Sequence, residues 1–156
     1  MKTLHLTTDE ARSLLTGKTT VYRPVADIPC GGFIQALRDG AWMWALDSRF
    51  EVCATRITCP WGDPLSNILL TEPWNRHGGL LSYQADGDWI ADYEKADPAA
   101  YASHRNLAPR WEPAEKMQPD DIREPSGRKL VDVGIVPSAE GWRWVLVIDG
   151  PEEASR

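Results

Sequence analysis

The stretch CPWGDPLSNILLTEPW, residues 59–74, decides the expected fold. Its first six residues carry two prolines and a glycine, which predicts an irregular loop because proline lacks a backbone N–H and glycine adopts turn conformations. The apolar run that follows, within Asn67–Trp74, predicts a buried strand that leads into a loop. Short strands bounded by such loops are typical of small domains built on sheets.

Upstream of this stretch, the sequence predicts one short helix over residues 8–16. Thr7 and Glu10 form the pattern of a capping box, in which each side chain accepts a hydrogen bond from the other residue's backbone N–H. Gly17 is expected to end the helix in the left-handed conformation. Three apolar residues lie between them at helical spacing: Ala11, Leu14 and Leu15.

The other periodic segments are rich in β-branched and aromatic residues and predict strands. These strands are expected at residues 18–24, 41–47, 51–58, 80–85, 129–136 and 142–149. Residues 41–58 should form a hairpin with its turn at Ser48-Arg49. Paired tryptophans within the strands, Trp42 with Trp44 and Trp142 with Trp144, are expected in the core.

The region from residue 86 to residue 128 is rich in Asp, Pro and Gly and predicts a long acidic loop, with one weak helix near Pro98–His104. Many short strands with one early helix predict an α+β fold, a small barrel. We expect a single domain over residues 1–150, followed by a polar tail at 151–156.

The composition limits the function. The chain has 156 residues and a net charge of −6, which argues against a general binder of duplex nucleic acid, because such a protein needs a basic face. Acidic residues outnumber basic ones between Asp86 and Glu124. This segment predicts a solvated face or, alternatively, a surface for a protein partner.

The three cysteines contain no CxxC pair, and the three histidines are scattered, so we expect free thiols and neither a metal nor a cofactor. No apolar run reaches the roughly 18 residues that span a membrane. Acidic residues interrupt the apolar N-terminal segment, which does not suit a signal peptide. These features predict a cytoplasmic protein without membrane contact.

The turn Cys59-Pro60-Trp61-Gly62-Asp63-Pro64, followed by Glu72 and Trp74, resembles the ASCH family of phage and prophage proteins. Two outer blocks are also similar: Gly17-Lys18-Thr19 before Arg23-Pro24, and Trp111, Pro113 and Met117. The resemblance implies a PUA-like β-barrel, an RNA-binding type of module, with a cleft between the first helix and the sheet.

The chain departs from the family pattern within the same blocks. Leu65 and Ser66 replace a Gly-Asp pair, and Val21 replaces the second threonine of the helix-end segment. The residues after Met117 are Gln118, Pro119, Asp120 and Asp121, where the family has an arginine and a tryptophan. The resemblance therefore implies a divergent member whose polar site is partly lost and more acidic.

The resemblance implies that the cleft binds RNA, single-stranded nucleic acid or a modified nucleoside. The tryptophans in loops are candidates for stacking on a base, and Arg23 suits a phosphate or an acidic neighbour equally well. The expected contacts are Lys18, Thr19, Arg23, Trp61, Glu72, Trp74 and Trp111.

Two other functions stay open. Some ASCH proteins are amidohydrolases that act on N4-acetylcytidine, and here Lys18 and Glu72 would be the catalytic pair, although Val21 at the threonine position counts against it. Without catalysis, Lys18 is a cation at a helix end and Glu72 a structural carboxylate. The third function is a phage-encoded interaction protein in the host cytoplasm, such as an inhibitor of host defence, that binds a partner through the acidic segment at 86–124.

Overall fold

A computed structural model describes residues 1–104 and 107–151. The strands and α-helices follow in the order β1 (Lys2–His5), α1 (Thr8–Thr16), β2 (Thr19–Pro24), β3 (Phe33–Ala36), β4 (Trp42–Ala45), β5 (Thr55–Ile57), β6 (Asn67–Thr71), β7 (Trp74–His77), β8 (Leu80–Tyr83), α2 (Trp89–Ala96), α3 (Pro98–Ser103), β9 (Arg128–Ser138) and β10 (Gly141–Ile148). Short 3₁₀ helices lie at η1 (Gln84–Asp86), η3 (Ala114–Lys116) and η4 (Pro119–Asp121).

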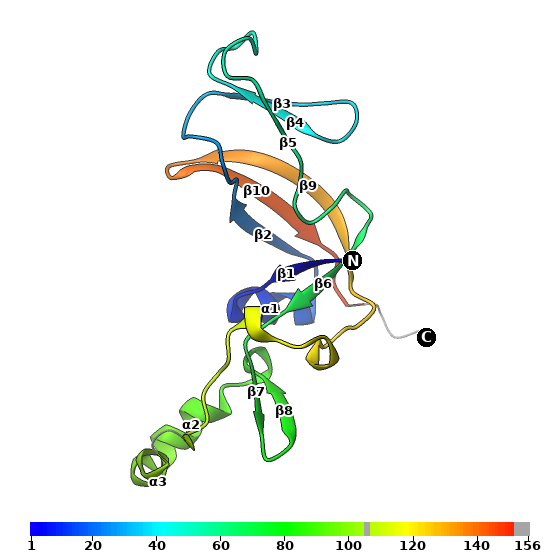
Figure 1. Ribbon diagram of the computed structural model, residues 1–156. Helices are drawn as coiled ribbons and strands as arrows, with labels where there is room; N and C mark the ends of the chain where they lie inside the picture. Colours follow the sequence, from blue (N-terminus) through cyan, green and yellow to red (C-terminus); the bar gives the residue numbers. More distant parts are fainter. Residues whose placement is uncertain (105–106, 152–156) are drawn as a thin grey trace.

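The strands form a central sheet with smaller sheets at its two ends (Figure 1). The central sheet has five strands in the order β1-β6-β9-β10-β2, with β1 parallel to β6 and the other pairs antiparallel. The strands β3, β4 and β5 form the upper sheet, and β7 with β8 forms a lower hairpin beside α2 and α3. The α+β class with a short N-terminal helix is confirmed. The sheets of the described residues are open, so the expected closure into a barrel is not found.

The core lies on one face of the central sheet, where buried side chains of β10 and β2 meet α1. Trp144, Leu146 and Ile148 alternate along β10 with half-exposed residues, which is the pattern of a strand buried on one face. Ala11 and Leu14 of α1 belong to the same apolar cluster. The helix predicted from the apolar spacing therefore covers the sheet as its periodicity indicates.

Tryptophans join the upper sheet to the central sheet. The rings of Trp42 and Trp144 meet edge to face with their centroids 5.2 Å apart. The indole N–H groups of Trp44 and Trp142 both donate to the carbonyl of Gly31, at 2.9 and 2.6 Å. The prediction that these tryptophan pairs lie in the core is confirmed for Trp44 and Trp144, which are buried; Trp42 and Trp142 are half-buried and pack against it.

The start of α1 agrees with its prediction, and its end does not. Both hydrogen bonds of the capping box between Thr7 and Glu10 are present. Gly17, however, has φ 175° and is extended, so the expected left-handed glycine cap is wrong. Arg128 of β9 caps the helix instead, because it donates to the carbonyl of Leu14 at 3.0 Å.

The predicted strands correspond to seven of the strands in the structure, short ones included: β2, β4, β5, β6, β8, β9 and β10. The expected turn at Ser48-Arg49 is too short, because β4 pairs with β5 across a loop over residues 46–54. The sequence did not predict β1, β3 or β7, which have four residues each. The expected acidic loop contains α2 as well as the predicted α3.

Candidate functional site

The groove beside α1, the expected cleft, is almost filled by protein. One wall consists of Leu6 before α1, apolar residues of α1 and Leu70 of β6. The other wall consists of Glu72 and the charged residues of the segment at 123–128. The remaining cavity has a volume of about 20 Å³. A single water molecule needs about 10–15 Å³ and ligand pockets have about 300–1,000 Å³, so this groove does not hold a nucleoside in the present conformation.

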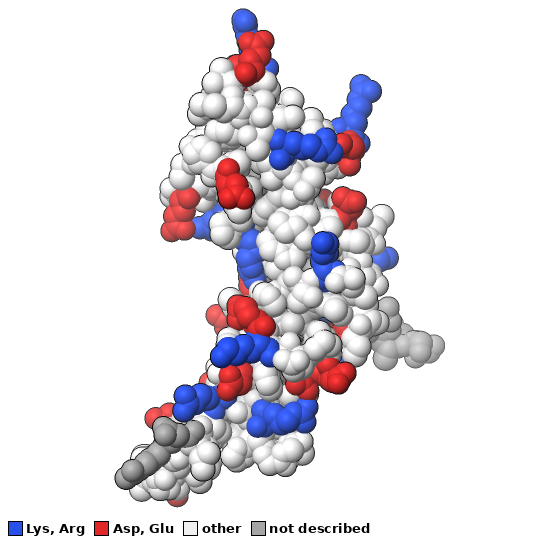
Figure 2. All heavy atoms as spheres, in the orientation of Figure 1, with Lys and Arg blue, Asp and Glu red and all other residues white. Residues whose placement is uncertain are grey.

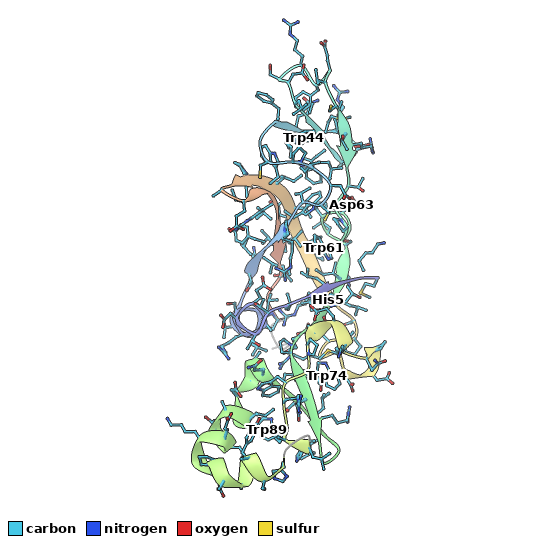
Figure 3. The ribbon with its side chains drawn as sticks, turned by 60° about the vertical axis from the view of Figure 1, so that its left-hand side comes forward. His5, Trp44, Trp61, Asp63, Trp74 and Trp89 are labelled. Atoms are coloured by element: carbon cyan, nitrogen blue, oxygen red, sulfur yellow. The ribbon has the colours of Figure 1, made fainter. Side chains whose placement is uncertain are left out.

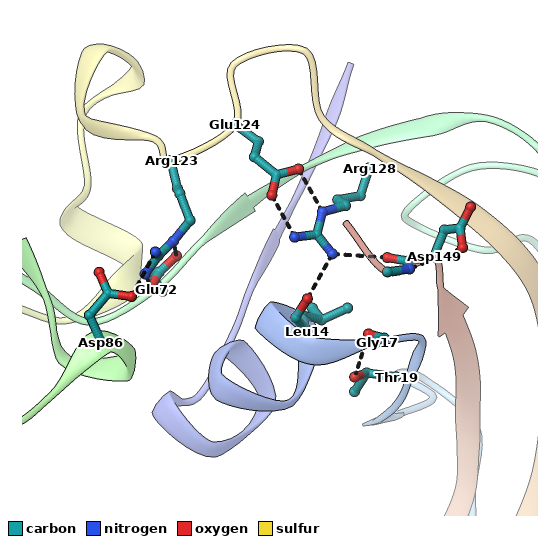
Figure 4. Close-up of polar contacts among 10 residues, drawn as sticks. Leu14, Gly17, Thr19, Glu72, Asp86, Arg123, Glu124, Arg128 and Asp149 are labelled. Carbon is teal, nitrogen blue, oxygen red and sulfur yellow. Dashed lines mark hydrogen bonds and ion pairs between the residues drawn. The ribbon is translucent and has the colours of Figure 1, made fainter. Parts of the chain in front are cut away.

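Arg123 fills the charged side of this groove. Its Nε and Nη2 atoms donate to the two carboxylate oxygens of Glu72 at 3.1 and 2.7 Å, and its Nη1 donates to Asp86 at 2.8 Å (Figure 4). Its guanidinium also lies over the ring of Tyr83, 4.3 Å from the centroid. Burial alone would lower the pKa of Arg123, but the hydrogen bonds and charges of Glu72 and Asp86 outweigh it and raise that pKa above its usual value.

The expected catalytic pair is not assembled in this structure. Glu72 is 5% exposed, and Arg123 occupies both of its carboxylate oxygens. A general base needs a free carboxylate oxygen in reach of the proton that it takes. Lys18 is exposed and does not line the groove in which Glu72 lies. Glu72 thus occupies the position of a structural carboxylate.

Two other expected contacts are also engaged by the protein itself. Arg23 donates to both carboxylate oxygens of Glu10, at 2.8 and 2.7 Å, and to the carbonyl of His5. The acidic neighbour, one of the two partners expected for Arg23, is therefore present. The hydroxyl of Thr19 donates to the carbonyl of Gly17 at the long distance of 3.5 Å, its one side-chain hydrogen bond among the described residues.

The three loop tryptophans lie in different places. Trp61 packs against the apolar core, and Trp111 donates to Asp88, the N-cap of α2, at 2.8 Å. Trp74 begins β7 in the lower part of the molecule, on the other side of His5 from Trp61 in the view of Figure 3. The predicted site residues therefore do not converge on one cleft.

Trp74 lines a much larger cavity, which we call the β7 cavity. It is wide open to solvent, and its volume is about 560 Å³, within the range of pockets that hold small molecules. β7 forms one side of it, and the segment from Glu112 to Asp121, which contains η3 and η4, forms the other. The lining residues are Trp74, Asn75, Arg76, Glu112, Lys116, Gln118 and Asp121.

The β7 cavity combines an aromatic ring with charges of both signs. Arg76 and Lys116 are exposed cations, and Arg76 pairs with the buried carboxylate of Asp121. The indole N–H of Trp74 is buried and has no acceptor among the described residues. A buried donor without an acceptor costs about 1–3 kcal/mol. This N–H is closed to solvent, so a ligand in the cavity meets the ring of Trp74 and not its N–H.

The signal for this cavity in the sequence was incomplete. Trp74, Gln118 and Asp121 stand at positions of the resemblance, whereas Arg76 and Glu112 belong to no motif. The pairing of Trp74 with Glu112 joins residues from different segments of the chain, through backbone hydrogen bonds in both directions. Such a contact requires the fold and cannot be found from spacing alone.

The acidic segment at 86–124 is partly structural. Asp88 and Asp97 are the N-caps of α2 and α3, each accepting a backbone N–H. Burial, which raises the pKa of Asp88, is outweighed by hydrogen bonds from Trp111, Ala91 and Gln84, which lower it. Other acids, such as Asp92 and Asp120, are exposed. On the face in Figure 2, acidic and basic side chains alternate without a continuous basic band.

In the described part of the chain, no helix is long and apolar enough to cross a membrane. No cluster of three metal-ligating side chains occurs among the same residues. The chain matches no protein-family model, and searches of curated proteins and of solved structures returned no match either. The assignment of a function therefore depends on the β7 cavity and its residues.

Proposed function

We propose that this chain is a divergent relative of the ASCH-type, PUA-like domains and that it binds RNA, single-stranded nucleic acid or a modified nucleoside. Its sheets are open where those domains have a barrel. The base is held in the β7 cavity and not in the groove beside α1. The volumes support this placement, since about 560 Å³ suits a nucleoside and about 20 Å³ does not.

The observation that carries the proposal is the position of Trp74 in the β7 cavity. A tryptophan at a cavity wall offers a flat apolar face, and stacking on a base stabilises binding by about 1–3 kcal/mol. The buried indole N–H plays no part in this contact, because it lies in the plane of the ring and is closed to solvent.

The charges around Trp74 suit a ligand with a phosphate. Arg76 and Lys116 line the same cavity, and their side chains are exposed. A net charge of −6 opposes extended contact with a polyanion, which favours one nucleotide or a short single-stranded segment over a duplex. We expect a small salt dependence of binding, in keeping with one or two phosphate contacts.

Substitution of two exposed lysines distinguishes the two possible binding sites, the β7 cavity and the groove beside α1. Lys116 lines the β7 cavity, whereas Lys18 lies at the end of α1. Binding of single-stranded RNA and of a nucleoside panel would be titrated by calorimetry in wild type, Lys116→Ala, Lys18→Ala and Trp74→Leu. We expect weaker binding in Lys116→Ala, little or none in Trp74→Leu and unchanged binding in Lys18→Ala. If only Lys18→Ala weakened binding, the binding site would be the groove beside α1. Absence of binding by the wild-type protein would overturn the proposal.

A further inference from the structure

Trp74 and Glu112 face each other directly across an antiparallel bridge. The N–H of Trp74 donates to the carbonyl of Glu112 at 3.2 Å, and the N–H of Glu112 donates to the carbonyl of Trp74 at 2.6 Å. Residues opposite one another in such a pair project their side chains to the same side, with Cβ atoms about 5 Å apart. The indole of Trp74 and the carboxylate of Glu112 are thus neighbours in the β7 cavity.

The Glu112 carboxylate is available to a ligand. Among the described residues, its side chain takes part in no hydrogen bond and no ion pair, whereas Asp121 in the same cavity is paired with Arg76. Glu112 is half-buried. A half-buried carboxylate accepts hydrogen bonds only, on two oxygens side by side, and it favours a ligand edge with two adjacent N–H donors.

Guanine is the base that fits these two neighbours. Its N1–H and 2-amino group are adjacent donors on one edge, so a carboxylate accepts from both while the ring stacks on an indole. Adenine and cytosine present a ring nitrogen with a lone pair next to their amino group, and uracil flanks its single N–H with two carbonyls. Each of those edges places an acceptor against the carboxylate, which is repulsive.

We propose, on the basis of the function proposed above, that the β7 cavity selects guanine. Trp74 supplies the stacking face and Glu112 accepts the two donors of the guanine edge. A good bidentate contact to a base discriminates against the wrong base by about 5- to 150-fold. Guanine nucleotides should therefore bind more tightly than adenine nucleotides by a factor in this range.

The test titrates the chain with the 5′-monophosphates of guanosine, inosine and adenosine by calorimetry. Inosine lacks the 2-amino group but keeps N1–H, so its affinity should lie between the other two. Glu112→Gln should reduce the preference for guanosine over adenosine to within about 3-fold, because the amide donates as well as accepts. Glu115→Gln is the matched control, since Glu115 is exposed and does not line the cavity; it should keep the preference.

The outcomes separate this selection from the proposed function. Equal affinities for the three nucleotides, or a preference that Glu112→Gln leaves intact, would overturn the guanine selection and leave base binding standing. Absence of binding to nucleotides and to single-stranded RNA alike would overturn both. If mononucleotides bind too weakly to titrate, uridine oligomers that carry one guanosine, inosine or adenosine give the same comparison. A variant that binds no ligand would be checked for its fold by circular dichroism.

Discussion

Arg128 donates a hydrogen bond of 3.0 Å to the backbone carbonyl of Leu14, 114 residues earlier in the chain. The same Nη1 atom donates to the carbonyl of Asp149, also at 3.0 Å, and the other guanidinium nitrogens hold Glu124. One buried side chain therefore ties the end of α1 to the end of β10 (Figure 4). It also supplies the positive charge at the helix C-terminus that Lys18 was expected to supply.

Replacing Arg128 should destabilise the protein strongly. Arg128→Met removes the donor of the buried Leu14 carbonyl and of the partly exposed Asp149 carbonyl, and it leaves Glu124 without its partner. We expect a loss of about 3–5 kcal/mol in the free energy of unfolding. Urea unfolding followed by circular dichroism measures it. Lys129→Met, a neighbouring change at an exposed position, is the control and should be within about 0.5 kcal/mol of wild type. Equal stability of the two variants would contradict the capping role of Arg128.

The pair of Arg23 and Glu10 should make stability depend on pH. Burial, which raises the pKa of Glu10, is outweighed by hydrogen bonds from Arg23 and Thr7, so that pKa lies below its ordinary value of 4.5. A carboxylate with a lowered pKa in the folded state contributes fully above pH 4.5, and the contribution is lost as the pH falls through the folded pKa.

Unfolding in urea at about pH 7 and about pH 3 would measure this contribution. Wild type should lose more stability between the two conditions than Glu10→Gln, by up to about 1 kcal/mol, because solvent screens this partly exposed pair. Glu51→Gln changes an exposed residue and should keep the pH dependence of wild type. Identical pH profiles of wild type and Glu10→Gln would refute the contribution of the pair.

Glu72 should matter for stability, as a structural carboxylate does. Glu72→Gln removes the charge that holds Arg123, and we expect a loss of about 1–3 kcal/mol. Asp86→Asn removes the other partner of Arg123, but Asp86 is 51% exposed and should cost less than about 1 kcal/mol. Thermal or urea unfolding of both variants gives the comparison. A stable Glu72→Gln variant would favour a functional role for this carboxylate.

Two glycines with similar backbone angles should respond differently to alanine. Gly127 has φ 78°, and a Cβ there would lie 2.5 Å from the carbonyl oxygen of Ile68, whereas Gly79 has φ 80° and open space around it. Gly79→Ala should cost about 1 kcal/mol from the left-handed backbone alone. Gly127→Ala adds a backbone clash and should cost about 3 kcal/mol. Equal melting temperatures of the two variants would show that the clash is relieved.

The sequence was most informative where structure depends on neighbouring residues. Thr7 and Glu10 are three positions apart, so their capping box could be predicted and is present. The long strands β9 and β10 carry alternation over enough residues to be recognised. By contrast, β1 has four residues and exists through its parallel pairing with β6, which a local pattern does not contain.

The candidate site was less predictable, because the ion pairs of its charged side chains join residues that only the folded chain brings together. Glu72 could have been a base or a structural carboxylate until Arg123, 51 residues away, was placed beside it. Arg23 suited a phosphate as well as a carboxylate, and in the structure its guanidinium binds the carboxylate of Glu10. Trp74 was expected beside α1, but β7 carries it to the lower part of the molecule.

The carbonyl of Gly31 accepts the indole N–H groups of both Trp44 and Trp142. One backbone oxygen therefore links β4 of the upper sheet to β10 of the central sheet. Gly31 lies just before β3, so a movement that lifts the upper sheet would break the hydrogen bond from Trp142 and keep the one from Trp44. The indole proton of Trp142, whose hydrogen bond is the more exposed of the two, should therefore exchange with solvent faster than that of Trp44.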